Sequence, residues 1–140
     1  MQDFVHLHVH TQYSILDGQA SIPRLVDKAM ADGMKGIAVT DHGDMFGIKE
    51  FFNYVNKKNS STNGEIKDLK KRIVGLEKGT VECDNPEAEL VACKEKLEAA
   101  KRKLFKPIFG CEMYVARRRL FNKEGKPDQS GYHLVVLAKK

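Results

Sequence analysis

The sequence lacks several features that would assign it to whole classes of protein. No apolar run approaches the roughly 20 residues that a membrane-spanning helix requires. The three cysteines, Cys83, Cys93 and Cys111, are odd in number and lack C-x-x-C spacing, which argues against a disulfide framework and a zinc ribbon. The N-terminus has neither the basic flank nor the apolar core of a secretory signal. These absences predict a cytoplasmic protein without a membrane role.

The composition fits one modest domain or part of one. The chain has 140 residues, of which 41% are hydrophobic and 31% charged, and domains typically hold about 100 to 150 residues. The net charge of +5 would suit a polyanionic partner. Much of that charge lies in a mixed-charge segment, which is typical of a solvated helix face. The net charge and the run Arg117-Arg118-Arg119 nevertheless leave a purely nucleic-acid-binding module as one alternative.

The first 56 residues predict two strand–helix units. Residues 4–10 alternate apolar side chains with His6, His8 and His10, which is the period of a strand with two unlike faces. A helix is expected from Pro23 to Gly33, and a buried strand over 36–40 leads directly into Asp41-His42-Gly43. A second helix is expected over 46–56. This order predicts an α/β fold, either a βα barrel or a doubly wound sheet, with functional groups at the carboxyl ends of the strands.

Residues 57–105 differ from both flanks. Apolar residues recur there at steps of three and four among charged ones, which predicts two helices packed as an antiparallel hairpin. Thr62 with Glu65 resembles a capping box, and Asp84 or Asn85 before Pro86 forms a good helix start.

Residues 106–140 predict a third and a fourth strand. The third covers 107–116 and includes Glu112 among apolar neighbours, and the fourth covers 132–138 and begins near His133. Four strands and two helices cannot close a barrel, so the chain is expected to be the N-terminal portion of a larger domain.

Imidazole and carboxylate groups recur at the strand ends and turns of this fold. These are the ligands that suit zinc, manganese and iron. Residues i and i+2 of a strand project to the same side roughly 6.5 to 7 Å apart, so His8 and His10 can converge on one ion. Asp41 is expected to orient His42 or a bound water, and His6 to form only hydrogen bonds. The candidate metal ligands are His8, His10, Asp17, His42, Glu112 and His133.

Five motifs in order resemble those of the polymerase and histidinol phosphatase (PHP) domain. The resemblance is to the form that opens the alpha subunit of bacterial DNA polymerase III, because His6 stands where stand-alone phosphatases usually have Asp. The motifs are His6-Leu7-His8-Val9-His10-Thr11, Tyr13-Ser14-Ile15-Leu16-Asp17-Gly18, Thr40-Asp41-His42-Gly43, Lys106-Pro107-Ile108-Phe109-Gly110-Cys111-Glu112 and Tyr132-His133-Leu134.

The resemblance implies a distorted seven-stranded βα barrel that holds up to three divalent metal ions, with the 57–105 hairpin as an insertion. It implies that His8 and His10 are first-motif ligands, Glu112 a bridging carboxylate, and Asp17, His42 and His133 further ligands. Other ligands of the family would lie beyond Lys140. The implied chemistry is phosphodiester hydrolysis, as in a 3′-to-5′ exonuclease, which needs no Ser or Cys nucleophile.

The parent protein would then be a DNA-directed DNA polymerase, of which this 140-residue chain alone is expected to be inactive. Its partners would be primer-template DNA and other replicase subunits, such as a sliding clamp and a proofreading subunit. Two alternatives stay open beside the nucleic-acid module. The domain could be a structural metal-binding scaffold that stabilises the polymerase, or a stand-alone PHP phosphatase that acts on a small phosphate ester.

Overall fold

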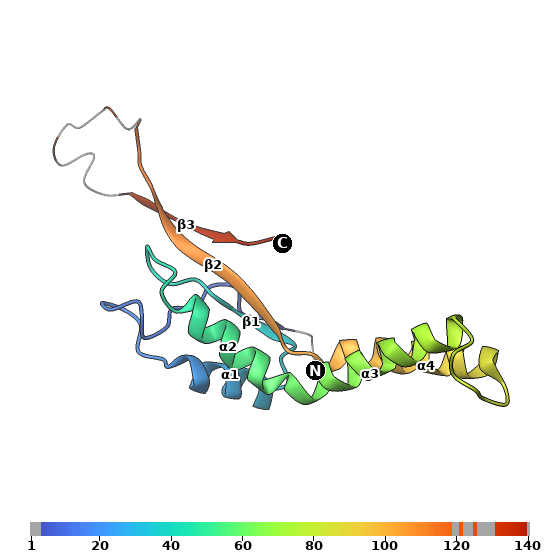
Figure 1. The fold of residues 1–140 in the computed structure, drawn as a ribbon. Coiled ribbons are helices and arrows are strands. Elements are labelled where there is room, and N and C mark those ends of the chain that lie inside the picture. Colours follow the sequence, from blue (N-terminus) through green and yellow to red (C-terminus); the bar gives the residue numbers. More distant parts are fainter. Residues whose placement is uncertain (1–3, 119–120, 122–124, 126–130, 140) are drawn as a thin grey trace. The chain divides into compact units, whose positions relative to one another are not determined.

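The computed structural model describes residues 4–118, 121, 125 and 131–139. It divides into two compact units, one formed by Met1–Val55 with Lys106–Lys140 and the other by Asn56–Phe105. The first unit contains a small sheet with helices, and the second is a helical hairpin (Figure 1). None of the helices in the described part of the chain has the length and apolarity to cross a membrane.

The sheet of the first unit has the order β1-β2-β3. Strand β1 (Gly36–Val39) pairs in parallel with the first part of β2 (Lys106–Val115), and β3 (Tyr132–Leu137) pairs antiparallel with the second part of β2. Neighbouring strands of a regular βα barrel are parallel. The β2–β3 pair therefore departs from that pattern, and the described residues form an open three-stranded sheet where the sequence predicts part of a barrel.

Helix α1 (Ile22–Ala31) contacts β1 in the core of this unit, and α2 (Ile48–Lys58) contacts β2 through the rings of Phe51 and Phe109. Helix α1 has Pro23 in its first turn and is followed by Gly33 at a φ of +78°, a backbone conformation that glycine adopts easily. Helix α2 buries Phe51 and Val55. All four residues of β1 are buried, as expected for a short apolar run in a parallel sheet. Full burial of one large aliphatic or aromatic side chain contributes about 1.5 to 3 kcal/mol.

The N-terminal segment does not form the regular strand that its alternation predicts. It lies beside β1 through two backbone hydrogen bonds of 2.9 Å, in which the amides of Ala38 and Thr40 donate to the carbonyls of His6 and Val9. The two donors are two residues apart, whereas the two acceptors are three apart. One extra residue near the bend at Leu7 therefore interrupts the pairing, as in a β-bulge.

The second unit consists of α3 (Ser60–Glu77) and α4 (Pro86–Lys103), within the 57–105 segment where the apolar spacing predicts two helices. Asn85 caps α4, because its side chain accepts a hydrogen bond of 3.2 Å from the amide of Ala88. The capping box predicted at Thr62 is wrong, since α3 already begins at Ser60. The hairpin core is made by Ile73, Leu76 and Cys93, with Leu69, Val81, Cys83, Leu90 and Leu97 packed around them.

A buried asparagine joins the two ends of the hairpin. The Asn59 side chain donates to the Phe105 carbonyl at 2.8 Å and accepts from the Phe105 amide at 3.1 Å. Asn59 precedes α3 and Phe105 follows α4, so one side chain satisfies both backbone groups of the residue at which the chain leaves the hairpin.

Substitution of this residue should loosen the base of the hairpin. Asn59→Ala leaves the buried Phe105 amide and carbonyl without these partners, which should lower the free energy of unfolding by about 1 to 3 kcal/mol and speed hydrogen exchange at the Phe105 amide. Asn53→Ala, at an exposed position of α2, is the control and should leave both unchanged. Equal exchange at Phe105 in the two variants would contradict the assignment.

Candidate metal centre

The carboxylate of Glu112 lies at the centre of a cluster of histidines. Glu112 is 4% exposed, and its oxygens lie 3.3 Å from His8 Nε2, 2.9 Å from His10 Nε2, 2.8 Å from His42 Nδ1 and 3.2 Å from His133 Nδ1. Burial raises the pKa of Glu112, but the four imidazoles together lower it by more than burial raises it. The net pKa of Glu112 is therefore below its usual value. This carboxylate is therefore ionised at neutral pH, as a metal ligand must be.

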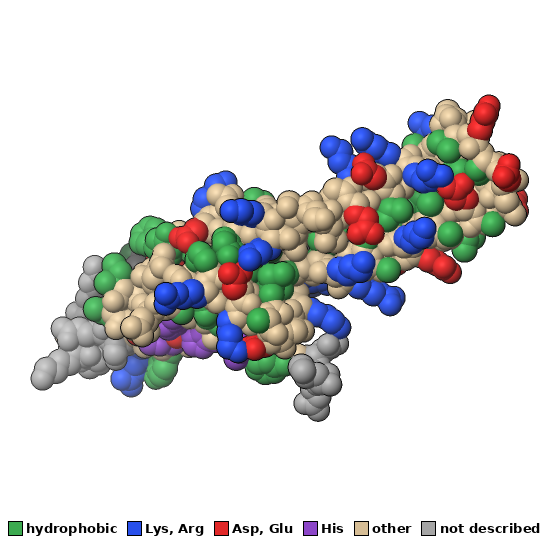
Figure 2. All heavy atoms as spheres, turned by 90° about the horizontal axis from the view of Figure 1, so that it is seen from below, with side chains coloured by type: hydrophobic (Ala, Val, Ile, Leu, Met, Phe, Trp, Pro, Cys, Tyr) green, Lys and Arg blue, Asp and Glu red, His purple; other side chains and the backbone are tan. Residues whose placement is uncertain are grey.

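Asp17 adds a second carboxylate to the cluster. Its Oδ2 lies 3.1 Å from His10 Nδ1 and 3.4 Å from His42 Nδ1. All six residues that the sequence singles out as candidate ligands therefore lie together, and Figure 2 displays the histidines as one patch on this unit. They form three overlapping groups in which the candidate ligand atoms lie within 4.8 Å of one another: His8 with His10 and Glu112, His10 with Asp17 and His42, and His42 with Glu112 and His133.

The backbone fixes Glu112 next to His42. His42 follows β1 at its carboxyl end and pairs with Glu112 of β2 as an isolated parallel bridge. The Gly43 amide donates to the Glu112 carbonyl at 2.8 Å, and the Glu112 amide donates to the Asp41 carbonyl at 3.1 Å. The relative positions of these two candidate ligands thus depend on the sheet and not on side-chain rotamers alone.

Asp41 lies beneath the cluster and holds the loop that carries Asp17. The Asp41 carboxylate is 1% exposed and accepts from the Thr11 amide at 2.6 Å, the Thr11 hydroxyl at 2.9 Å and the Ser14 hydroxyl at 3.0 Å. Ser14 Oγ in turn accepts from the His42 amide at 3.0 Å. Asp41 therefore reaches the backbone of His42 through Ser14, and its predicted role in orienting His42 or a bound water stays a prediction.

The donor set fits a divalent cation. Imidazole nitrogens and carboxylate oxygens are the ligands of zinc, manganese and iron. Two buried atoms, His42 Nδ1 and Glu112 Oε2, have no hydrogen-bond partner among the described residues although they lie 2.8 Å apart. A cation held between such atoms would satisfy both. His8, His10, Asp17 and His133 would complete its surroundings.

Two neighbouring residues stand outside this donor set. The His6 ring packs edge-on against Phe4, with ring centroids 4.8 Å apart. Burial raises the pKa of the Cys111 thiol, whose sulfur donates to the Asp41 carbonyl at 3.7 Å. Cys111 is not a member of the candidate ligand groups in the described residues, which offer nitrogen and oxygen donors.

The histidine and carboxylate pattern has a counterpart among known families. The family model described as PHP domain matches residues 6–140, which is nearly the whole chain. The chain belongs to the PHP domain family. The residues of the cluster all lie within the matched range, as does the helical hairpin.

Curated relatives of this PHP domain include the DNA polymerase III subunit alpha of several bacteria. That of Treponema pallidum is 34% identical over 137 residues, and that of Borreliella burgdorferi is 32% identical over 139 residues; each match covers 97% of this chain and 8% of the relative. The subunit of Mycobacterium tuberculosis H37Rv is 50% identical over 74 residues, or 53% of this chain and 5% of the relative. The chain thus spans about 8% of the length of the first two relatives.

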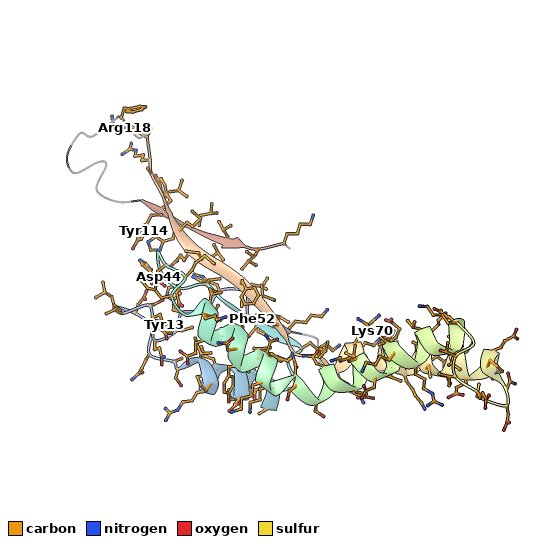
Figure 3. The ribbon with its side chains drawn as sticks, viewed as in Figure 1. Tyr13, Asp44, Phe52, Lys70, Tyr114 and Arg118 are labelled. Carbon is orange, nitrogen blue, oxygen red and sulfur yellow. The ribbon has the colours of Figure 1, made fainter. Side chains whose placement is uncertain are left out.

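Tyr114 is a neighbour of the cluster that the sequence argument missed. Its hydroxyl contacts His42 Nε2, and its ring centroid lies 5.0 Å from those of His42 and His133. Figure 3 places it on β2 near Asp44, and a Cβ at Gly43 would lie 3.2 Å from the Tyr114 ring. The sequence contains a signal for this proximity. Tyr114 follows Glu112 by two residues, and alternate residues of a strand share a face.

Loss of the Asp41 carboxylate should release the loop that carries Asp17 in this PHP domain. Asp41→Ala should lower the free energy of unfolding by about 3 kcal/mol or more, since each hydrogen bond to a charged group contributes about 1.5 to 3 kcal/mol. Chemical denaturation measures this loss. Asp44→Ala is the matched control, because its one hydrogen bond to the Phe46 amide is exposed to solvent, and it should cost about 1 kcal/mol or less. Similar losses in both variants would refute the anchoring role of Asp41.

Proposed function

We propose that the cluster around Glu112 is a divalent metal centre, in the PHP domain of a replicative DNA polymerase of the DNA polymerase III alpha type. The supporting observation is that one buried carboxylate lies 2.8 to 3.3 Å from four imidazoles. The proposed ligands are His8, His10, Asp17, His42, Glu112 and His133. The names of the relatives support the assignment to a polymerase.

The tautomers of the histidines favour a metal over a network of hydrogen bonds. A neutral imidazole has one N–H donor and one lone pair. His10 directs Nδ1 at Asp17 and Nε2 at Glu112, at 3.1 and 2.9 Å, so one of these nitrogens would present a lone pair to a carboxylate. Such a contact is repulsive unless the ring is protonated or a cation lies between the two groups. A metal ion removes this conflict for several rings at once.

The proposed reaction is hydrolysis of phosphodiesters, as in a 3′-to-5′ exonuclease acting on a primer end. Divalent ions in such a centre would supply activation of water and stabilisation of charge on the attacked phosphate. The residues of this chain would hold the ions, with Glu112 fixed by β2 and Asp17 held through Asp41. Zinc, manganese and iron suit these donors, and we propose up to three ions in the complete domain.

The remaining proposals concern the longer protein. DNA-templated DNA synthesis and contacts with a sliding clamp and a proofreading subunit would depend on regions outside these 140 residues, and primer-template DNA would be bound by the full-length polymerase. We also propose that residues 57–105 are an insertion between the second helix and the third predicted strand of a PHP barrel, and that the 140-residue chain alone is inactive.

Removal of two proposed ligands tests the metal centre. In the full-length polymerase, His8→Ala with His10→Ala should reduce bound metal, measured by mass spectrometry, and abolish PHP exonuclease activity on a labelled primer, because two nitrogen donors are lost. His6→Ala is a matched control from the same segment and should retain both. Full metal content together with full nuclease activity in the double variant would refute the assignment.

The same measurements separate the alternatives. Metal loss with reduced stability, in a full-length protein that has no nuclease activity before mutation, identifies the structural scaffold. Hydrolysis of small phosphate esters but not of DNA identifies the phosphatase. Either result would replace the proposed exonuclease reaction while keeping the metal ligands.

Tyr114 should strengthen metal binding by fixing the tautomer of His42. Because His42 directs Nδ1 at Glu112 and Asp17, a cation there would take Nδ1 and leave the proton on Nε2, which donates to the Tyr114 hydroxyl. Tyr114→Phe removes this acceptor and should weaken metal binding about tenfold or more. Competition with a metal-binding dye measures the affinity. Tyr132→Phe is the control, and equal affinities in the two variants would rule out this role.

A further inference from the structure

The charges of the helical hairpin are divided along its length. Its base half (residues 56–72 and 94–105) contains eleven Lys or Arg and four Asp or Glu, whereas its tip half (residues 73–93) contains one Lys and five Asp or Glu. Figure 2 shows acidic side chains gathered at the tip, and Lys and Arg side chains along the part nearer the base. Part of this separation follows the dipole of α4, which has Glu87 and Glu89 in its first turn and three basic residues in its last turn. The lysines in the middle of α3 are not explained in this way, because α3 has no basic residue in its last turn.

Three lysines of the base half have no acidic partner in the described part of the chain. Lys67, Lys70 and Lys71 are exposed on α3, where Lys70 is labelled in Figure 3. Three other basic residues of the hairpin are paired: Arg72 with Glu89, Lys94 with Glu77 at 3.1 Å, and Lys101 with Glu98. The three lysines surround a shallow hollow on α3 that is completed by Asn63, Ile66 and Val74.

The chemistry of this surface favours a polyphosphate over a protein. Protein interfaces usually depend on buried aromatic or arginine anchors. Residues 56–105 contain one aromatic residue, Phe105, which is 4% exposed, and Arg72 beside the lysines is engaged by Glu89. Lysines supply mobile point charges that suit phosphate oxygens, and their binding gains free energy from counterion release.

The same lack of aromatic side chains distinguishes duplex from single-stranded nucleic acid. Proteins bind single strands largely by stacking the unpaired bases on aromatic rings. The hairpin offers no exposed ring for this purpose in its described residues, whereas a duplex presents its phosphates outward and requires none. Side chains three and four residues apart on a helix lie about 5 to 6 Å from each other, so the three lysines act as one cationic patch.

We propose that Lys67, Lys70 and Lys71 form a binding site for the phosphate backbone of duplex DNA. The site belongs to the hairpin unit and shares no residue with the metal centre, so it goes beyond the proposed function and can fail or hold independently of it. The acidic tip half repels phosphates and confines the duplex to the base half. Binding should be independent of DNA sequence, since the contacts reach only the backbone.

The test measures binding of a fluorescein-labelled duplex to the full 140-residue chain by fluorescence anisotropy at several salt concentrations. The triple variant Lys67→Gln, Lys70→Gln, Lys71→Gln should bind about tenfold or more weakly, and the slope of log affinity against log salt should fall by about 2 to 3, because each lost phosphate contact removes about 0.9. The triple arginine variant at the same positions should bind as tightly as the original chain.

The matched control removes the same charge elsewhere through Lys28→Gln, Lys49→Gln and Lys78→Gln, and should change affinity and salt slope little. Circular dichroism verifies that each variant is folded. Unchanged duplex binding in the first triple variant would overturn the proposal, as would tighter binding of a single strand than of the duplex. Displacement of the duplex by polyglutamate at equal charge concentration would assign the surface to an acidic polypeptide and would also overturn it.

Discussion

The first unit is organised around the buried negative charge of Glu112. An ionised carboxylate at 4% exposure is unfavourable without compensating charge or hydrogen bonds. Four histidines, brought from an extended segment, the end of β1 and the start of β3, surround it. Strand β2 places this charge by pairing with β1 before Glu112 and with β3 around it. The same strand, β2, therefore forms both the parallel and the antiparallel pair of the sheet and carries the carboxylate at the centre of the cluster.

Much of the site could be predicted from residue types and their spacing. The residue types and spacing singled out His8, His10, His42, Glu112 and His133, and these residues lie together in the structure. The way in which they meet was not predictable, because β3 is antiparallel to β2 and brings His133 in at the start of its strand. The supporting contacts could not be found in this way. Asp41 and Ser14 act through hydrogen bonds between segments 27 residues apart, and no local pattern encodes such a pairing.

The fold was predictable where periodicity is strong and less so where strands depend on neighbours. Steps of three and four among the apolar residues of 57–105 indicated two helices, and the buried run at β1 was also recognisable. The alternation in residues 4–10 indicated a regular strand, but the extra residue near Leu7 breaks the pairing with β1. That residue also separates His6 from His8 and His10, since a shift of one residue reverses which side chains share a face. The alternation of apolar and polar residues is the same with or without such a bulge, so the sequence pattern alone does not reveal it.

The two hydrogen bonds between Asn59 and Phe105 bring together the points at which the chain enters and leaves the hairpin. Forty-five residues separate Asn59 from Phe105, yet their closure constrains the backbone as a tight turn would. Segments of this kind can change length at their far end without altering the spacing of the residues on either side. The hairpin is therefore a position where evolution, or an engineer adding a tag or a foreign domain, can extend or trim the chain while β2 keeps its register with β1.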